Sequence, residues 1–138
     1  MSLPSKHYET LLVTAAAEHV LQITLNRPES SNAFNTHMAR EMIELIEALS
    51  LDPEDNRCIL LTGAGERAFC AGGDLKERKG MTDQDWGKQH LTFERMVRAI
   101  INSPTPIIAV INGAAYGGGC ELAGAVDFAY ASDNARFA

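Results

Sequence analysis

Hydrophobic and polar residues alternate along the chain with two different periods, and these periods predict the order of its elements. In the segment 19–25, leucine or isoleucine occupies every second position from Leu21 onward, as expected for a strand with one buried face. Another β-prone run at 8–14 precedes it by a few residues, so the two segments predict a hairpin. The runs 58–62 and 107–111 predict buried strands, the first of them covered on both faces, and 126–131 predicts a fifth strand.

Apolar residues at helical spacing predict two long helices. The first begins near Asn35, with Asn35 or Thr36 as its N-cap, and core packing explains its apolar stripe. The second begins with a predicted capping box of Thr82 and Asp85 and ends before Pro104. The two stripes consist of Met38, Met42, Leu45, Ile46 and Leu49 in the first helix and of Phe93, Met96, Val97, Ile100 and Ile101 in the second.

The composition narrows the class of protein. With 138 residues, of which 46% are hydrophobic, the chain predicts one domain with a real core at 8–138, behind an N-terminal tail at 1–7. The net charge is −6 and no basic cluster occurs, so we expect no nucleic-acid partner. The longest apolar run is far shorter than the roughly 18 residues of a membrane span. Because the N-terminus also lacks the pattern of a signal peptide, we expect a cytoplasmic protein without a membrane partner.

A glycine-rich turn after the strand 107–111 is the first candidate for chemistry. Gly117, Gly118 and Gly119 have no side chains, so their backbone N–H groups can approach a bound atom closely. Because the turn leads into a predicted helix, the helix dipole also favours an oxygen that gains negative charge there. Glu121, one turn into the helix, would place a carboxylate beside that oxygen. The alternative is a purely structural role for the turn. Its glycines would then only allow close packing at a tight strand-to-helix corner, and Glu121 would be an acid of the first helical turn that the helix dipole favours.

A second glycine-rich turn follows the strand 58–62. Ala71, Gly72 and Gly73 again leave backbone N–H groups uncovered, and a short helix is predicted to open at Asp74. Two such turns can hold one carbonyl oxygen between two N–H donors, with the carboxylate of Glu121 close by. Acyl-transfer and enolate chemistry require this kind of site.

Other motifs fit the sequence less well. The segment 63–68 matches the loose form of a dinucleotide fingerprint, but a small-residue turn stands where the fingerprint needs a helix. No Lys-Ser or Lys-Thr follows either glycine cluster, and no serine lies in a nucleophile elbow. The four histidines are scattered, so we expect no metal site. The odd number of cysteines, three, predicts reduced thiols rather than disulfides or zinc ligands.

Three blocks of sequence carry a resemblance to a known family. They are LNRPESSNAFN at 25–35, AFCAGGDLKER at 68–78 and NGAAYGGGCELAGAVD at 112–127. In order and spacing they resemble the signature blocks of the crotonase, or enoyl-CoA hydratase/isomerase, superfamily. The resemblance runs from about residue 8 to the end of the sequence. It implies an α/β (α+β) fold, a superhelix of ββα units with two roughly perpendicular sheets, assembled as a homo-trimer or hexamer.

The resemblance covers only the N-terminal half of that fold. A family domain continues past Ala138 with a second catalytic glutamate and with C-terminal helices that complete the pocket and the trimer. We therefore expect a longer gene product with hydratase activity. A chain that truly ended at Ala138 would be poorly stable and inactive, because sheet edges and apolar faces would be left open.

The resemblance also assigns site residues. The two N–H donors of an oxyanion hole for the thioester carbonyl fall on Gly73 and Gly118, and Glu121 matches the first of the two glutamates that hydratases of the family use. Coenzyme A is part of the acyl-CoA substrate, so no separate cofactor is implied. The cationic stretch 76–79 is either a contact for the CoA phosphates or a solvated helix end. The implied contacts of the substrate and CoA are Ala33, Ala71, Gly72, Gly73, Asp74, Leu75 and Gly118.

The resemblance implies an enoyl-CoA hydratase, which adds water across the 2,3 double bond of an acyl-CoA through an enolate. One alternative with the same fold is an enoyl-CoA isomerase, which usually relies on a single acid. Another is a hydratase for branched substrates, because CAGGDLKER resembles the methylglutaconyl-CoA hydratase branch. A protein that binds acyl-CoA without turnover is the alternative outside catalysis. An acid both at Glu121 and beyond Ala138 would favour hydration.

Overall fold

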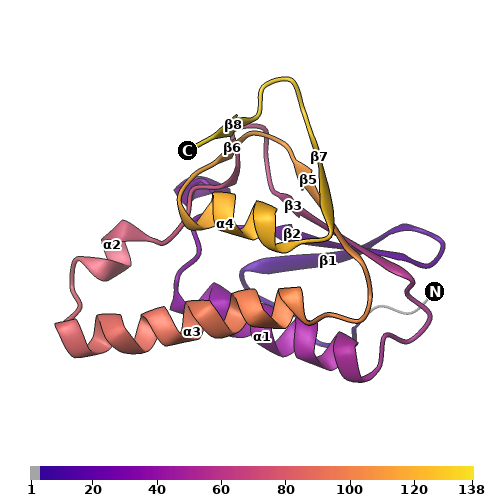
Figure 1. Ribbon diagram of the computed structural model, residues 1–138, viewed down its shortest axis with the longest axis horizontal. Helices are drawn as coiled ribbons and strands as arrows, with labels where there is room; N and C mark the ends of the chain where they lie inside the picture. The colour runs from indigo at the N-terminus through magenta and orange to yellow at the C-terminus, as the bar shows by residue number, and fades with distance from the viewer. Residues whose placement is uncertain (1–3) are drawn as a thin grey trace.

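A computed structural model describes residues 4–138, so residues 1–3 of the predicted N-terminal tail lie outside the described part (Figure 1). Along the chain the strands and helices are β1 (Leu11–Ala17), β2 (Val20–Leu25), the 3₁₀ helix η1 (Pro28–Ser30), α1 (Thr36–Leu51), β3 (Cys58–Gly63), β4 (Ala68–Cys70), α2 (Leu75–Arg78), α3 (Asp83–Ile101), β5 (Ile107–Ile111), β6 (Ala114–Ala115), α4 (Gly118–Ala125), β7 (Phe128–Ala131) and β8 (Arg136–Phe137).

The strands form two sheets. The larger has the order β1-β2-β3-β5-β7, in which β1 and β2 form the predicted antiparallel hairpin and the other neighbours run parallel. The smaller consists of the parallel strands β4, β6 and β8. Its strands were not predicted, because two or three residues are too few to show an alternating pattern. Since β4 and β6 are parallel neighbours, the glycine-rich turns that follow them leave the same edge of this sheet.

The bounds of β1 differ from the prediction by three residues, since the strand spans Leu11–Ala17 rather than 8–14. Pairing with β2 sets these bounds, with Leu11 opposite Leu25 and Ala17 opposite Val20. The alanines at the end of β1 have weak strand propensity, so the sequence pattern missed them.

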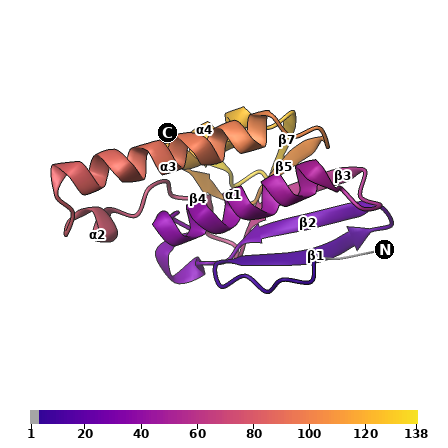
Figure 2. The same cartoon turned by 90° about the horizontal axis from the view of Figure 1, so that it is seen from below.

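The core lies on the face of the larger sheet against which α1 and α3 pack side by side (Figures 1 and 2). Ile59 and Leu61 of β3 are buried, whereas Cys58 and Leu60 on the opposite face are only partly buried. The expectation that this strand is covered on both faces is therefore wrong. The reason is that the two helices cover the face that carries Ile59 and Leu61, and the other face is packed less completely.

Both long helices begin as predicted. The Asn35 side chain caps α1 by accepting a hydrogen bond from the Met38 N–H at 2.8 Å, and Thr82 and Asp85 form the capping box of α3. All five residues of the first predicted stripe are buried. In the second stripe only Met96 and Ile100 are buried. Phe93 and Val97 line a pocket, whereas Ile101 is exposed and lies outside it.

Asn32 connects the segment after β2 to the loop between β3 and β4. Its side chain is fully buried, and its Oδ1 accepts a hydrogen bond from the Arg27 N–H at 3.0 Å. Its Nδ2 donates to the carbonyl oxygens of Ala64 and Ala68, both at 2.9 Å. One amide side chain thus satisfies three backbone groups and holds β4 at the position from which the second glycine-rich turn starts.

We predict that Asn32→Ala lowers the free energy of unfolding by about 3 kcal/mol, because buried backbone groups lose their partners. Equilibrium unfolding in urea measures the change. Asn102→Ala, at the exposed C-cap of α3, is the matched control and should change the free energy of unfolding by less than about 0.5 kcal/mol. Equal urea midpoints for the two variants would contradict the role assigned to Asn32.

Candidate active site

The two glycine-rich turns lie against each other where β4 and β6 end. The Tyr116 N–H donates to the Cys70 carbonyl oxygen at 3.0 Å. Gly72 has a φ of +95°, and a Cβ at this position would lie 2.8 Å from the Tyr116 carbonyl oxygen and 3.2 Å from the Gly118 nitrogen. A side chain at residue 72 would therefore separate the turns. The turns pack backbone against backbone, which places residues 73 and 118 near each other.

Several N–H groups that the sequence suggested would be uncovered have partners. Gly117 and Gly119 each donate to a backbone carbonyl oxygen at 2.8 Å, and Ala71 does so at 3.0 Å. The Gly72 N–H contacts the sulfur of Cys70 at 3.4 Å. The expectation of three uncovered N–H groups in each turn is therefore wrong. Ala71 and Gly117 donate to distant segments, at Ser31 and Ala138, and Gly72 and Gly119 donate to acceptors two or three residues earlier in the chain.

The N–H groups of Gly73 and Gly118 have no hydrogen-bond partner among residues 4–138. Gly118 is the first residue of α4, so its own helix offers no carbonyl oxygen for it. Beside Gly73, Phe34 forms an isolated bridge and donates its N–H to the Gly72 carbonyl oxygen. The two residues predicted as oxyanion-hole donors are thus the ones whose N–H groups stay available. That both bind one oxygen is still a prediction.

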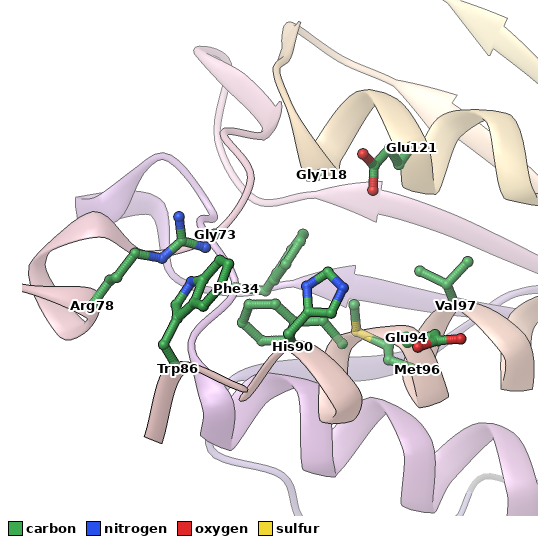
Figure 3. A pocket seen from close by; sticks show the side chains of 11 residues that line it. Phe34, Gly73, Arg78, Trp86, His90, Glu94, Met96, Val97, Gly118 and Glu121 are labelled. Carbon is green, nitrogen blue, oxygen red and sulfur yellow. The ribbon is translucent and has the colours of Figure 1, made fainter. Parts of the chain in front are cut away.

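Gly73, Gly118 and Glu121 line one pocket with a volume of about 440 Å³. Figure 3 shows Glu121 on α4, across the pocket from His90 and Val97 of α3. Glu121 is an exposed residue, so its side chain is not packed into the core. The complete lining is Phe34, Gly73, Arg78, Trp86, His90, Phe93, Glu94, Met96, Val97, Gly118 and Glu121.

The sequence analysis missed the wall that α3 contributes. Trp86, His90, Phe93 and Val97 line the pocket at helical spacing. Phe93 also packs edge-on against Phe34, with 4.7 Å between the ring centroids. The sequence did contain a signal for this wall, because these residues continue the apolar stripe of α3 toward its N-terminus. The stripe begins at Trp86, two helical turns before Phe93, where the predicted stripe began. Periodicity alone does not distinguish a stripe that faces a core from one that faces a pocket.

An ion pair holds together the segments predicted to bind CoA. Arg27 donates to the Ala33 carbonyl oxygen at 2.6 Å and to the Asp74 carboxylate at 3.0 Å, and the two charged side chains are only 15% and 12% exposed. Burial by itself would raise the pKa of Asp74, but the hydrogen bonds from Arg27 and from the N–H groups of Glu77 and Lys76 outweigh it and lower the pKa. Ala33 and Asp74 therefore lie together.

The predicted CoA contacts are not equally accessible. Ala33 is buried and Asp74 is only partly exposed, whereas the Leu75 side chain is 73% exposed. The Asp74 carboxylate is used as the N-cap of α2 and as the partner of Arg27. Any contact of these residues with CoA, and of Ala71 and Gly72 beside them, stays a prediction.

A second carboxylate anchors α2 to the rest of the molecule. One oxygen of Glu77 accepts hydrogen bonds from both the N–H and the hydroxyl of Thr36 at 2.9 Å, and from the side-chain amide of Gln89. Thr36 begins α1 and Gln89 is a buried residue of α3. The short helix α2 is therefore fixed to both long helices, and its position relative to the pocket is defined.

The described residues offer no group of three or more His, Cys, Asp or Glu side chains arranged to hold a metal ion. The three cysteines have free thiols, and burial raises the pKa of Cys70 to about 12, so this thiol stays protonated near neutral pH. Within residues 4–138, no helix is both long enough and apolar enough to cross a membrane.

The comparisons with known proteins agree with this geometry. A family model described as Enoyl-CoA hydratase/isomerase matches residues 15–138. The chain belongs to this family. The crystal structure of the enoyl-CoA hydratase from Bacillus anthracis is similar over 94% of the chain and 50% of that protein, with a TM-score of 0.91 and 36% sequence identity. The predicted crotonase fold is therefore confirmed.

Relatives in the enoyl-CoA hydratase/isomerase family carry different activities in their names. The short-chain-enoyl-CoA hydratase of Clostridium acetobutylicum is 40% identical over 118 residues, which are 86% of this chain and 45% of that protein. The mitochondrial Delta(3,5)-Delta(2,4)-dienoyl-CoA isomerase of Homo sapiens is 36% identical over 145 residues, 97% of this chain and 44% of that protein. The chain thus spans about half the length of the relatives it matches, as the resemblance implied.

We predict opposite effects on stability for two glycines that are replaced by alanine. A Cβ at Gly118 would lie 2.4 Å from Cζ of the buried Phe34 ring, so Gly118→Ala should lower the free energy of unfolding by about 1–3 kcal/mol. Gly87 lies inside α3 with no atom within 4 Å of a Cβ, so Gly87→Ala should raise it by about 0.5–1 kcal/mol. Thermal and urea unfolding measure both. Equal changes would contradict the packing described for Phe34.

We also predict that Asp74→Asn lowers the free energy of unfolding near neutral pH by about 2–3 kcal/mol, because Arg27 loses its partner. The folded-state pKa of Asp74 lies below its ordinary value of 3.8. Its ionised form therefore stabilises the fold above that value, and this contribution disappears as the pH falls through the folded pKa. Unfolding curves from pH 7 down to pH 3 should show the difference between Asp74→Asn and wild type shrinking. A difference that stays constant would contradict this, and Asp133→Asn at an exposed position is the control.

Proposed function

We propose that the protein is an enoyl-CoA hydratase that adds water across the 2,3 double bond of an acyl-CoA thioester. The observation that carries the proposal is that Gly73 and Gly118, whose N–H groups are unpaired among residues 4–138, line one pocket with Glu121. The similarity to the short-chain-enoyl-CoA hydratase of Clostridium acetobutylicum supports the same reaction.

The two N–H groups would act on the thioester carbonyl. When water adds at Cβ, electrons of the double bond move toward the carbonyl and its oxygen gains negative charge, giving an enolate. A donor that binds the enolate oxygen more strongly than it binds the oxygen of the ground-state carbonyl lowers the free-energy barrier of the reaction. Each such donor contributes roughly 3 kcal/mol. Because Gly73 and Gly118 are held by turns that pack against each other, the donors would need little reorganisation during the reaction.

Glu121 would act as a general base in this reaction. As a base its carboxylate takes a proton from the attacking water while the water oxygen bonds to Cβ, and a proton is then delivered to Cα to give the 3-hydroxyacyl-CoA. We propose that a second carboxylate, expected beyond Ala138 from the family resemblance, delivers this proton. Assembly as a homo-trimer or hexamer is proposed on the same basis.

An isomerase is the second candidate function. The identity with the human Delta(3,5)-Delta(2,4)-dienoyl-CoA isomerase is similar to that with the hydratase, and the same oxyanion hole would serve both reactions. Isomerisation moves a proton between two carbons and consumes no water. Incubation in ¹⁸O-labelled water therefore distinguishes them, because only hydration puts the label into the product.

We predict that Glu121→Gln lowers kcat for crotonyl-CoA by at least about a hundredfold, since proton transfer by a positioned carboxylate contributes about 10²–10⁴. The affinity for a saturated acyl-CoA should change by less than about threefold, because glutamine keeps the size of the side chain. Steady-state kinetics of the full-length protein and calorimetric titration measure the two quantities.

The matched control for this prediction is Glu66→Gln, which changes an exposed carboxylate outside the pocket. It should leave kcat and affinity unchanged. Turnover like that of the wild type in Glu121→Gln would remove Glu121 from the chemistry. Tight binding of acyl-CoA with no product from any enoyl-CoA, by the wild-type protein, would favour a binding protein instead.

A further inference from the structure

Aromatic rings gather in the pocket of the candidate active site. Eleven residues line this pocket, two of them glycines, and three of the other nine are Phe or Trp. Phe, Trp and Tyr together make up only 7% of the chain, so the lining is enriched in these rings. The imidazole of His90 is a fourth ring in the wall. Figure 3 shows Phe34, Trp86 and His90 across the pocket from Gly118 and Glu121.

Two of these rings lie close to the glycines that are expected to bind the thioester oxygen. A Cβ at Gly118 would lie 2.4 Å from Cζ of Phe34, and a Cβ at Gly73 would lie 3.6 Å from Cε2 of Phe93. The two phenyl rings pack edge to face, with 4.7 Å between their centroids. Because the rings lie beside both glycines, an acyl group whose thioester oxygen is bound there would lie against aromatic carbon.

Trp86 presents its ring to the pocket rather than to the core. It is the only tryptophan of the chain and is 43% exposed, whereas Phe34 is 5% exposed. The guanidinium carbon of Arg78 lies 5.4 Å from the centroid of the Trp86 ring. The centroid of the His90 ring lies 5.9 Å from it, with the two rings tilted by 34°. These neighbours hold the indole in place, and its exposed surface can stack with a flat group of a ligand.

An aromatic group fits this lining better than an alkyl chain of the same size. An alkyl chain gains affinity from the apolar area that it buries. An aromatic ring buries a similar area and also gains from the electrostatic attraction between the faces and edges of rings. Among the described lining residues other than glycine, only Met96 and Val97 are apolar without a ring. The volume of about 440 Å³ lies within the range of pockets for small ligands.

We propose that Trp86 selects an acyl group with an aromatic ring on Cβ, so that the substrate class is the CoA thioesters of 3-aryl-2-propenoic acids. This rests on the proposed function, in which Gly73 and Gly118 bind the thioester oxygen and Glu121 acts at Cβ. The aromatic ring is conjugated with the double bond, so the acyl group is flat from the thioester to the ring. Because His90 lies across the pocket from Glu121, a ring on Cβ would lie against the wall of His90 and Trp86. Stacking of the adenine base of CoA on Trp86 is the competing outcome of the test.

Two acyl-CoAs that share one carbon skeleton and lack the 2,3 double bond test the proposal on the full-length protein. 3-Phenylpropionyl-CoA ends in a flat aromatic ring, and 3-cyclohexylpropionyl-CoA ends in a puckered aliphatic ring. If apolar area alone decided the affinity, the cyclohexyl compound would bind at least as tightly, because its apolar surface is larger. We expect the phenyl compound to bind the wild type about fivefold more tightly, as measured by calorimetric titration.

Variants of Trp86 show whether its ring causes the preference. Trp86→Leu should reduce the preference to less than about twofold, because leucine has no ring face, and Trp86→Phe should keep most of it. Leu91→Ala is the matched control, since it truncates an exposed apolar residue of α3 that does not line the pocket. It should leave both affinities unchanged. Circular dichroism and the Tm of Trp86→Leu confirm that the variant is folded.

Three binding results would overturn the proposal. The first is equal affinity of the wild type for the two compounds. The second is a preference for the phenyl compound that survives Trp86→Leu. The third is that Trp86→Leu weakens both compounds and free CoA by the same factor, which would assign Trp86 to the CoA moiety.

Turnover separates this inference from the proposed reaction. Trp86→Leu should lower kcat/KM for cinnamoyl-CoA, in which the ring on Cβ is phenyl, by about fivefold, and for crotonyl-CoA by less than about twofold. Each variant is compared with the wild type on the same substrate, so the different reactivities of the two substrates cancel. If the binding preference is found but no enoyl-CoA is hydrated, the hydratase proposal fails and the aromatic site stands. If crotonyl-CoA is hydrated and the binding preference is missing, the aromatic site fails.

Discussion

The contact between two backbone turns governs the arrangement of the site. Residue 72 approaches Tyr116 and Gly118 so closely that a Cβ would lie 2.8 Å from a carbonyl oxygen, and a Cβ at Gly119 would lie 2.0 Å from the Cys70 carbonyl oxygen. Glycine is required where main chain meets main chain at this distance. Hydrogen bonds within the turns and to distant segments use four of their six N–H groups, and the two that have no partner among residues 4–138 belong to residues that line the same pocket.

Polar side chains hold these turns without covering them. Asn32 satisfies three buried backbone groups next to β4, Arg27 joins Ala33 to Asp74, and Glu77 joins α2 to both long helices. None of these side chains bonds to the N–H group of Gly73 or Gly118. The arrangement separates two tasks, because side chains fix the geometry while backbone N–H groups stay available for a substrate.

Much of the architecture could be predicted from the residues alone. The hairpin, the caps at Asn35 and Thr82, and the two long helices follow from short-range patterns, since a cap or an alternating stripe depends on neighbours in the sequence. The three sequence blocks predicted the crotonase fold correctly. The strands β4, β6 and β8 could not be predicted, because strands this short are stabilised by pairing with distant segments.

The two turns at 71–73 and 117–119 could be located from the sequence, because glycine content depends on residue type alone. Tertiary structure decided which N–H groups of residues 71–73 and 117–119 have no partner among residues 4–138. The reason is that their acceptors lie elsewhere in the chain or depend on how each turn closes. The wall of Trp86, His90 and Phe93, and the place of Arg78 beside Gly73, were likewise decided by packing. A helical stripe looks the same in sequence whether it faces a core or a cavity, and only the positions of the other elements separate the two.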